Sequence, residues 1–190
     1  MSPNLFASHL SLFRVYYAML LYHGSNLTVE QPRLIGQTRG LDFGFGFYLT
    51  TSESQAVRFS EIVVHRKKQG IATVSVYDFD TAAAERTLSI RRFEKADAEW
   101  LRFVVDHRLN IYRGESYDIV IGAVANDKVM PTIQLLIGGF IDEEAALIAL
   151  KTSKLVDQVC IKSEKALTLL RFVNSYEVQF YLAKGGNING

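Results

Sequence analysis

The hydrophobic pattern of this chain changes its period repeatedly, which predicts short strands interleaved with helices. In residues 72–78, Ala72, Val74 and Val76 alternate with other side chains, which is the two-residue period of a strand. Strands are also predicted over residues 19–22, 45–50, 117–121, 155–161 and 176–182, with a further one over 86–93.

A helix is predicted to begin after Ser52, because residues 52–55 read Ser-Glu-Ser-Gln, the pattern of a capping box. Its apolar side carries Ala56, Phe59, Ile62 and Val63. It is predicted to end in the basic run 65–68 before Gly70, since cations stabilise a helix C-terminus. Further helices are predicted over 96–109, 142–151 and 163–172, and a loop over 24–41.

This mixture of short elements favours an α+β domain over a regular βαβ winding. A chain of 190 residues is long enough for one domain with a sizeable core. We expect residues 1–18 to be an N-terminal extension, 19–184 to form the domain and 185–190 to be a flexible tail. The apolar stretch 10–22 is too short to span a bilayer and lacks the basic start of a signal peptide, so no membrane partner is expected.

Composition and charge narrow the classes of function. The net charge of +1 gives no global field for nucleic acid or anionic membrane, although Arg86, Arg91, Arg92 and Lys95 cluster locally. The single cysteine, Cys160, excludes an intramolecular disulfide and a multi-cysteine metal site, and a reducing, cytoplasmic setting is expected. Cys160 is predicted to be a buried, inert thiol, and His65 and His107 are predicted to lie on the surface.

Two short motifs carry the candidate chemistry. The first, Leu-Tyr-His-Gly-Ser at residues 21–25, ends a strand and delivers His23 to a turn. The second, at 42–51, reads Asp-Phe-Gly-Phe-Gly-Phe-Tyr-Leu-Thr-Thr, a bend that leads into a strand ending in hydroxyls. Its glycines, Gly44 and Gly46, permit a close approach of the backbone to a ligand.

Together these motifs resemble the nicotinamide pocket of ADP-ribosyltransferases of the diphtheria-toxin and poly(ADP-ribose) polymerase type. In those enzymes a His-Gly-Ser/Thr strand and a Gly-x-Tyr strand clamp NAD. The resemblance is strongest to a small bacterial family of that superfamily, domain of unknown function 3990 (DUF3990), over roughly residues 19–172. It implies an ADP-ribosyltransferase fold in which two small β-sheets with flanking helices form an NAD cleft, with NAD as substrate and no metal.

The resemblance implies roles for the residues of the two motifs. His23 would hydrogen-bond a ribose hydroxyl, Gly24 would offer its backbone to the nicotinamide carboxamide, and Ser25 would place a hydroxyl beside it. Tyr48 matches the tyrosine that stacks on the nicotinamide ring. A lone histidine after an apolar strand is usually structural or solvent-exposed. The functional interpretation of His23 therefore depends on its occurrence together with the motif that contains Tyr48.

The third element of the superfamily is usually a glutamate on a later strand, and Gln158 stands at that position here. An amide can hydrogen-bond a ribose hydroxyl but brings no charge to an oxocarbenium ion. The departure favours transfer of a single ADP-ribose over chain elongation and leaves room for loss of activity. An ordinary polar residue on a strand is the alternative for Gln158, and Glu177 is a second candidate for the third element.

Relatives in the resembling family carry an Asp-x-Val-x-Gly-x-x-Ala-x-Asp segment, matched here by residues 118–127. Physically it is a buried strand that breaks at Gly122 into a loop with polar tips. Asp127 could supply the carboxylate that Gln158 lacks. The alternative is a turn capped by the side chains of Asn126 and Asp127.

Four further residues complete the expected NAD-binding set: Asp42, Phe43, Phe47 and Thr50. Asp42 would orient the loop or touch NAD, with capping of the turn as the alternative. Core packing is expected for at least one of Phe43, Phe45 and Phe47. Thr50 precedes a helix N-terminus whose spare N–H groups suit a pyrophosphate, whereas Ser52 is expected to be a plain cap.

The expected function is therefore transfer of one ADP-ribose from NAD to a macromolecular acceptor, a protein or a nucleic acid, with release of nicotinamide. Family resemblance further implies a bacterial toxin or defence effector with an antitoxin or immunity partner. Two alternatives stay open: a catalytically degenerate NAD-binding or interaction module, and an NAD glycohydrolase that uses water as the acceptor.

Overall fold

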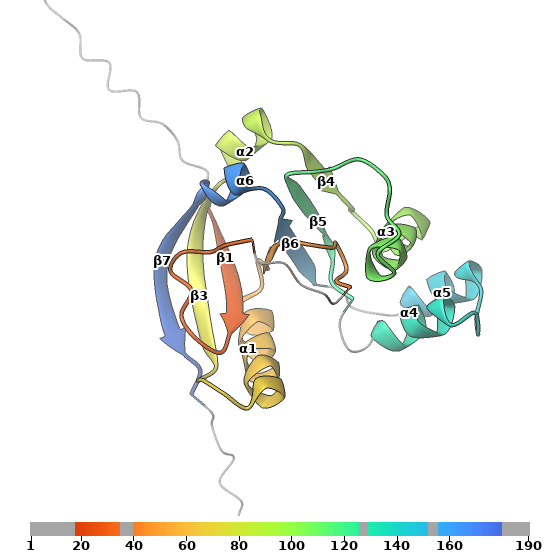
Figure 1. Cartoon of the computed structure of the whole chain (residues 1–190), viewed down its shortest axis with the longest axis horizontal. Coiled ribbons are helices and arrows are strands. Elements are labelled where there is room, and N and C mark those ends of the chain that lie inside the picture. The colour runs from red at the N-terminus through yellow and green to blue at the C-terminus, as the bar shows by residue number, and fades with distance from the viewer. Residues whose placement is uncertain (1–17, 35–39, 126–128, 152–155, 180–190) are drawn as a thin grey trace, which may run out of the picture.

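The computed structural model describes residues 18–34, 40–125, 129–151 and 156–179, which form a mixed α+β fold with two small sheets (Figure 1). The antiparallel first sheet has the order β1 (Ala18–Ser25), β3 (Thr73–Asp80) and β7 (Leu170–Glu177). The second sheet has the order β2 (Phe47–Leu49), β6 (Asp157–Ile161), β5 (Ile119–Ala123) and β4 (Ile90–Arg92). The predicted α+β class is confirmed.

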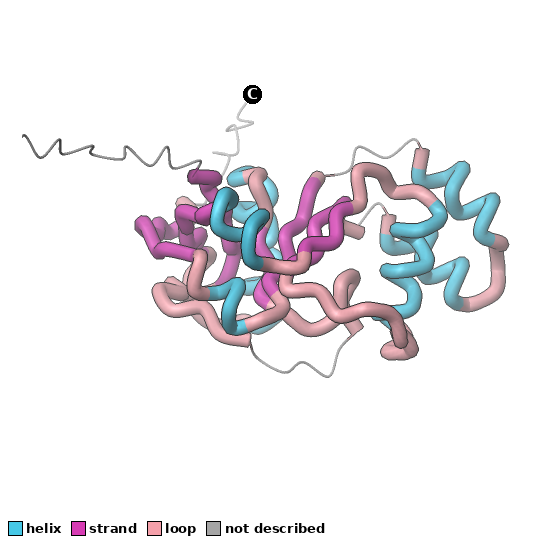
Figure 2. The backbone as a smooth tube through the Cα atoms, turned by 90° about the horizontal axis from the view of Figure 1, so that it is seen from above, coloured by secondary structure: helices cyan, strands magenta, loops and turns pink. Residues whose placement is uncertain are grey.

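Helices lie on both sides of the paired sheets (Figures 1 and 2). The described helices are α1 (Glu53–Lys67), α2 (Thr81–Thr87), α3 (Ala98–Arg108), α4 (Met130–Ile137), α5 (Glu143–Leu150) and α6 (Glu164–Leu167). Helix α1 packs on β1 and β3, whereas α3, α4 and α5 lie beyond the second sheet. Among the helices of the described residues, none is both long enough and apolar enough to span a membrane.

The two sheets pack against each other through apolar side chains that fill the space between them. Leu21 and Tyr77 of the first sheet and Ile119, Val159 and Ile161 of the second belong to this buried cluster. Because these residues alternate with others along their strands, the opposite faces of both sheets are free to pack against helices. The second sheet is thus covered on both sides.

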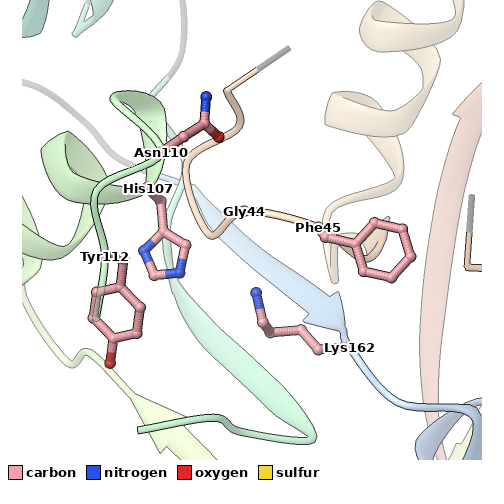
Figure 3. Close-up of a pocket in the computed structure, with 6 residues that line it drawn as sticks. All are labelled: Gly44, Phe45, His107, Asn110, Tyr112 and Lys162. Carbon is pink, nitrogen blue, oxygen red and sulfur yellow. The ribbon is translucent and has the colours of Figure 1, made fainter. Parts of the chain in front are cut away.

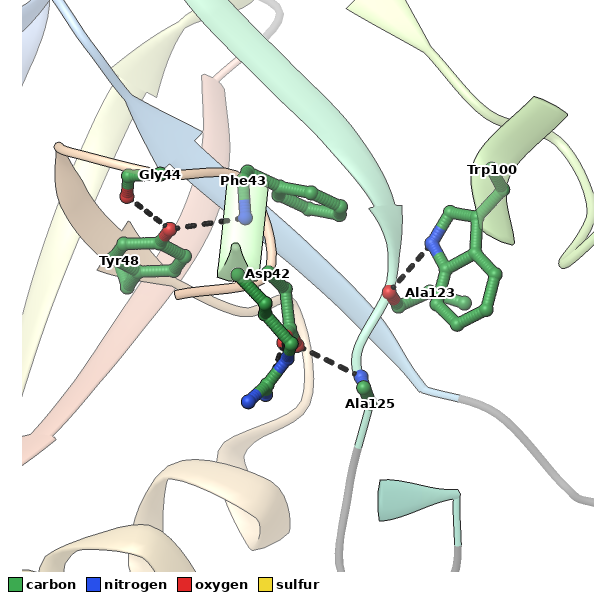
Figure 4. Close-up of polar contacts among 8 residues, drawn as sticks. Asp42, Phe43, Gly44, Tyr48, Trp100, Ala123 and Ala125 are labelled. Atoms are coloured by element: carbon green, nitrogen blue, oxygen red, sulfur yellow. Dashed lines mark hydrogen bonds and ion pairs between the residues drawn. The ribbon is translucent and has the colours of Figure 1, made fainter. Parts of the chain in front are cut away.

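A second buried cluster joins the far face of the second sheet to helices α3 and α5. Trp100 of α3 lies at its centre and is completely buried, together with Phe43 and Val120. The indole Nε1–H donates a hydrogen bond of 3.0 Å to the carbonyl oxygen of Ala123 at the end of β5 (Figure 4). Trp100 therefore buries its apolar body without leaving its polar group unpaired.

A two-bond bridge joins the two sheets at β1 and β2. The backbone N–H of Tyr22 donates to the carbonyl of Thr50 at 2.9 Å, and Thr50 returns a bond of 3.0 Å to the carbonyl of Tyr22. This bridge brings the first predicted motif against the second.

Helix α1 approaches β1 most closely at Gly24. A Cβ atom placed on Gly24 would lie 2.1 Å from the carbonyl oxygen of Ala56 and 2.9 Å from the backbone nitrogen of Ser60. Both neighbours are backbone atoms of the helix, so they cannot move aside as a flexible side chain could. Ala56 and Ser60 are the buried residues of α1, and small side chains at these two positions permit the contact.

Several predicted elements are present with corrected ends. Ser52 caps α1 as predicted, because its Oγ accepts a bond of 3.3 Å from the backbone N–H of Gln55. The strand predicted over 45–50 is confined to β2 with the Thr50 bridge. The predicted apolar side of α1 is wrong for Phe59, which is 47% exposed.

Three further differences separate the prediction from the structure. The strand predicted over 86–93 forms only as β4, whereas residues 86 and 87 end α2, which begins at Thr81 because the side chain of Asp80 caps its first turn and three alanines favour the helix. The helix predicted over 163–172 ends after one turn, and β7 begins at Leu170, where pairing with Phe79 of β3 overrides local propensity. Helix α4 was not predicted.

Most of the predicted N-terminal extension and the whole predicted tail lie outside the residues that the structure describes. Residues 1–17 of the expected extension and the whole expected tail, 185–190, lie outside the described residues. The described elements all lie within the predicted span of 19–184, apart from Ala18 at the start of β1.

Replacing Gly24 with alanine should destabilise the fold. The added methyl group would force α1 away from β1, and overpacking of this kind costs about 1–3 kcal/mol of the free energy of unfolding. Urea unfolding of Gly24→Ala, with Ser25→Ala as the control in the same strand end, measures the effect. A loss of stability no larger than that of Ser25→Ala would contradict the close contact.

Candidate functional site

His23 lies where the two motifs meet. Its side chain points from β1 towards β2, and its Nδ1 is 2.8 Å from the carbonyl oxygen of Tyr48. Its ring also packs on the ring of Phe47, with centroids 4.5 Å apart. Burial lowers the pKa of His23, the nearby charge of Lys67 lowers it further, and the bond to Tyr48 opposes both effects. The imidazole is therefore neutral at physiological pH.

The tautomer of His23 follows from its partner. A carbonyl oxygen can only accept, so Nδ1 carries the proton that points at Tyr48. In a neutral ring the other nitrogen, Nε2, is then unprotonated and acts as an acceptor. His23 thus presents a fixed hydrogen-bond acceptor to any ligand beside β1.

Tyr48 holds the glycine-containing bend in shape. Its hydroxyl donates a bond of 2.5 Å to the carbonyl of Gly44 and accepts one of 3.2 Å from the backbone N–H of Phe43 (Figure 4). Burial is the main cause that raises the pKa of this phenol. The hydroxyl is therefore a structural group, while the ring stays partly exposed.

The backbone of Gly24 faces the open edge of β1. Tyr22 directs its N–H and carbonyl towards Thr50 and not towards β3. In an antiparallel pair this direction alternates, so Gly24, two residues further on, points the same way. Beyond the Thr50 bridge β1 pairs with no other described strand on that side, so both groups face an edge of the sheet that no described strand covers.

Gln158 lies on β6, next to the strand that carries Tyr48. Cys160 pairs with Tyr48, and Gln158 pairs with Gly122 of β5. Residues two apart on a strand share a face, so the side chains of Tyr48, Cys160 and Gln158 project from the same side of the sheet. The Oε1 atom of Gln158 is buried and has no hydrogen-bond partner among the described residues.

Thr50 and the next residue are held by a carboxylate at the start of β6. The hydroxyl of Thr51 donates to both carboxylate oxygens of Asp157, at 2.7 and 2.8 Å. Thr50 Oγ1 lies 3.4 Å from the same carboxylate and accepts a bond of 3.0 Å from the backbone N–H of Ser52. These contacts fix the passage from β2 into α1.

Asp42 orients the bend from its other end. Its carboxylate pairs with the guanidinium of Arg108, whose Nε lies 2.8 Å away, and accepts a bond of 3.0 Å from the backbone N–H of Ala125 (Figure 4). Asp42 is 5% exposed. The loop-orienting role expected of Asp42 is the one these contacts describe.

The remaining candidates are placed as follows. Phe43 and Phe47 are buried in two different core clusters, which confirms core packing for at least one of the three phenylalanines, whereas Phe45 is 45% exposed. Asp127 lies outside the described residues. Glu177 ends β7, and β3 separates it from β1 and His23.

His107 corrects a prediction. Expected at the surface, it is 9% exposed, because Phe103 and Tyr112 pack on its ring with centroid distances of 4.2 Å each. His65 is exposed, as predicted. Cys160 is buried as predicted, and burial raises the pKa of its thiol to about 12, so the thiol stays protonated.

Two of the four residues of the predicted basic cluster pair with neighbouring carboxylates. Arg91 pairs with Glu99, and Arg92 pairs with Glu85. Such exposed pairs add little stability, but they reduce the local positive potential that a nucleic-acid site would need.

Two pockets flank the second sheet. One, of about 270 Å³, is lined by Gly44, Phe45, His107, Asn110, Tyr112 and Lys162 (Figure 3). The other, of about 340 Å³, lies at the ends of β4 and β5 beside Phe93, Gly122 and Asp157. His23, Tyr48 and Gln158 line neither pocket. Within the described residues, no group of three or more histidine, cysteine, aspartate or glutamate side chains could hold a metal ion.

Sequence reasoning missed three residues that support the site: Arg108, Asp157 and Lys162. Asp157 carried a signal, since it directly precedes Gln158 on an apolar strand. Arg108 and Lys162 carried none, because their partners, Asp42 and Phe43, are 66 and 119 residues away in the chain.

Comparison with known proteins places the chain in one family. Residues 19–172 match the profile of a family described as a protein of unknown function, DUF3990. The chain belongs to the DUF3990 family. The match runs from Met19 in β1 to Phe172 near the start of β7 and includes both motifs. No curated protein and no solved structure matches the chain.

The lowered pKa of His23 predicts acid sensitivity of the DUF3990 protein. Folded His23 binds a proton less readily than the unfolded residue, whose pKa is near 6.5. The unfolded state therefore holds more protons below that pH, so the free energy of unfolding should fall as the pH is lowered from 7 to 5. Burial also lowers the pKa of His107, so protonation of this residue should reduce the free energy of unfolding over the same pH range.

Comparison with His23→Asn isolates the contribution of His23. The asparagine amide can still donate to the carbonyl of Tyr48 but does not titrate, so the variant should lose part of the pH dependence. Urea unfolding at pH 7, 6 and 5 and an NMR titration of His23 measure both effects. A pKa of His23 at or above 6.5 in the folded protein would contradict the assignment.

Proposed function

We propose that this DUF3990 protein is a mono-ADP-ribosyltransferase whose NAD site lies at the end of β1, where β1 meets β2 and β6. The observation that carries the proposal is the hydrogen bond between His23 and the carbonyl of Tyr48. It joins the two motifs into one unit, although they are far apart in sequence, and it orients the imidazole.

Hydrogen-bond complementarity supports NAD as the ligand. Nε2 of His23 is an acceptor and suits a ribose hydroxyl, which is a donor. The N–H and carbonyl of Gly24 face the same edge and suit the nicotinamide carboxamide, which has both an acceptor and a donor. Apolar side chains fill the space between the sheets, which supports the edge of β1 over the space between the sheets as the proposed position of the ligand.

Gln158 supplies the third contact of the proposed site. A buried acceptor without a partner costs about 1–3 kcal/mol, and a ribose hydroxyl reaching Oε1 would remove that cost. The residue shares a face of the sheet with Tyr48, whose partly exposed ring could pack on the nicotinamide. The side chains of Tyr48 and Gln158 project from the face opposite to Phe47, on which the ring of His23 packs, so a ligand would have to reach both faces of β2 to touch all three side chains.

The proposed reaction breaks the bond between ribose C1′ and the nicotinamide nitrogen. Nicotinamide leaves with the bonding electron pair as a neutral molecule, and the ribose becomes an oxocarbenium ion. A nucleophilic atom of the acceptor then forms the new bond to C1′ and loses a proton. A neutral Gln158 can position the ribose but cannot offset positive charge, which favours a single transfer over elongation.

Two alternatives differ in the fate of ADP-ribose. Water as the acceptor would make the protein an NAD glycohydrolase, and the absence of a charge at Gln158 favours a degenerate NAD-binding module. The proposal extends to a role as a bacterial toxin or defence effector with a neutralising partner, and this step rests on the family resemblance described above.

Incubation with labelled NAD and a cell lysate tests the proposal. We expect release of nicotinamide and label on a macromolecule, with separation into protein and nucleic-acid fractions identifying the acceptor class. NAD at millimolar concentration should also raise the melting temperature, because it binds the native state only. His23→Ala should abolish most of this shift, whereas His65→Ala, at the exposed end of α1, should keep it.

The outcomes separate the candidates. Free ADP-ribose without labelled macromolecule would favour the glycohydrolase, and a melting shift without nicotinamide release would favour the degenerate module. Absence of both a melting shift and nicotinamide release at millimolar NAD would refute NAD as the ligand.

Substitution of Gln158 tests the third contact. If Gln158 orients the ribose, Gln158→Ala should lower the rate of nicotinamide release by roughly ten- to a thousandfold with little change in NAD binding. Gln158→Glu should be tolerated or should raise NAD hydrolysis, because a carboxylate stabilises the oxocarbenium ion. Wild-type rates in Gln158→Ala would remove Gln158 from the site and leave Asp127 and then Glu177 as the candidates.

A further inference from the structure

The 270 Å³ pocket beside Gly44 has the features of a separate binding site (Figure 3). None of the residues proposed to contact NAD lines it. Its walls come from three parts of the chain: the bend at Gly44 and Phe45, the end of α3 with the following loop, and Lys162 directly after β6. None of the six lining residues is acidic.

Lys162 brings a positive charge into this pocket without a carboxylate beside it. Its ammonium group donates one hydrogen bond, to the carbonyl of Phe43. Within the described residues it takes part in no ion pair. An ammonium has three N–H donors, so two are left for another partner. Burial lowers the pKa of Lys162, because it disfavours the charged form of the ammonium.

His107 adds a second oriented polar atom. Its Nδ1 lies 2.9 Å from the carbonyl of Phe103 and therefore carries the proton, which leaves Nε2 as an acceptor in the neutral ring. The rings of Phe103 and Tyr112 pack on the imidazole and hold its direction. A Cβ atom on Gly44 would lie 3.3 Å from this Nε2 and 3.4 Å from Nζ of Lys162, so both atoms converge on Gly44.

We propose that this pocket binds the phosphoryl group of a small phosphorylated ligand. Lys162 supplies the charge and two donors, and Nε2 of His107 accepts the hydrogen bond of a protonated phosphate oxygen. A hydrogen phosphate is one of the few anions that can satisfy a cation and an acceptor together. The inference stands independently of the proposed transfer reaction.

The size of the pocket limits the ligand. A volume of 270 Å³ equals roughly nine water molecules at about 30 Å³ each. Pockets for drug-sized ligands begin at about 300 Å³. The pocket therefore suits a phosphoryl group with a small organic part, and a larger ligand would extend out of it into solvent.

Calorimetric titration at constant ionic strength tests the site. The ligands are inorganic phosphate, ribose 5-phosphate as a phosphomonoester, and sulfate, which has no proton to donate to His107. We expect saturable binding of phosphate that is at least about tenfold tighter than that of sulfate. Tighter binding of ribose 5-phosphate than of phosphate would assign an organic ligand, and the reverse would assign free phosphate.

The matched variants are Lys162→Gln and Lys95→Gln. Glutamine can still donate to the carbonyl of Phe43, so Lys162→Gln removes the charge with little disturbance of the bend. Lys95 is an exposed lysine beside the other pocket and controls for the loss of one positive charge. Phosphate binding should weaken by at least about tenfold in Lys162→Gln and by less than about twofold in Lys95→Gln.

An NMR measurement keeps the test valid if Lys162→Gln is unstable. Phosphate added to the wild-type protein should shift the Nε2 resonance of His107 and leave that of the exposed His65 nearly unchanged. Absence of saturable phosphate binding to the wild type would overturn the proposal. Equal effects of phosphate and sulfate, or unchanged binding in a folded Lys162→Gln, would overturn it as well.

Discussion

The backbone bridge between Tyr22 and Thr50 is the contact on which the arrangement of the candidate site depends. These two hydrogen bonds hold an edge strand of one sheet against an edge strand of the other. From this bridge His23 reaches the carbonyl of Tyr48, Gly24 turns its backbone to the open edge, and Thr50 leads into α1. Separation of the sheets by a few ångström would break the bond of His23 to Tyr48 and would move Thr50 and the start of α1 away from Gly24.

A buried ion pair between Asp42 and Arg108 holds the bend at residues 42–46, which leads into β2. Asp42 and Arg108 are both largely buried, and Asp42 also accepts the N–H of Ala125. Burial of two charges is costly, but loss of one partner alone costs about 3–5 kcal/mol because the other charge is left unpaired. The pair therefore acts as a constraint on geometry. It ties the bend at 42–46 to the end of α3 and to the exit of β5, and Tyr48 closes the same bend from within.

The sequence predicted those elements that are determined by residues adjacent in the chain. The capping pattern at Ser52, the alternation in β3 and the glycine-containing bend before Tyr48 were all readable from neighbouring residues. Residues 163–172 were not, because Leu170–Glu177 becomes a strand only through pairing with β3. The surface prediction for His107 failed for the same reason: Tyr112 covers it only after the chain turns back beyond α3.

The residues of the candidate site fall into the same two groups, those that a local motif identifies and those that only the folded chain brings together. Short motifs identified His23, Gly24 and Tyr48, because each motif is contiguous in sequence. The partners that fix them come from distant segments, as Asp157 does for Thr51 and Lys162 does for Phe43. No spacing rule connects such residues in a single sequence. The sequence also could not show that the hydroxyl of Tyr48 is engaged by Gly44, which gives that residue a structural as well as a proposed ligand-binding role.

The position of Cys160 has a consequence for how motion of this region can be followed. Its thiol lies in the middle of β6, between Tyr48 on β2 and Val120 on β5, and is completely buried. The bend at Phe45 and Gly46 and the core cluster around Trp100 cover the sulfur, so a reagent can reach it only after one of these covers moves off the sheet. The rate of thiol alkylation under native conditions therefore reports how often this face of the second sheet opens, and the native sequence supplies the probe without an added label.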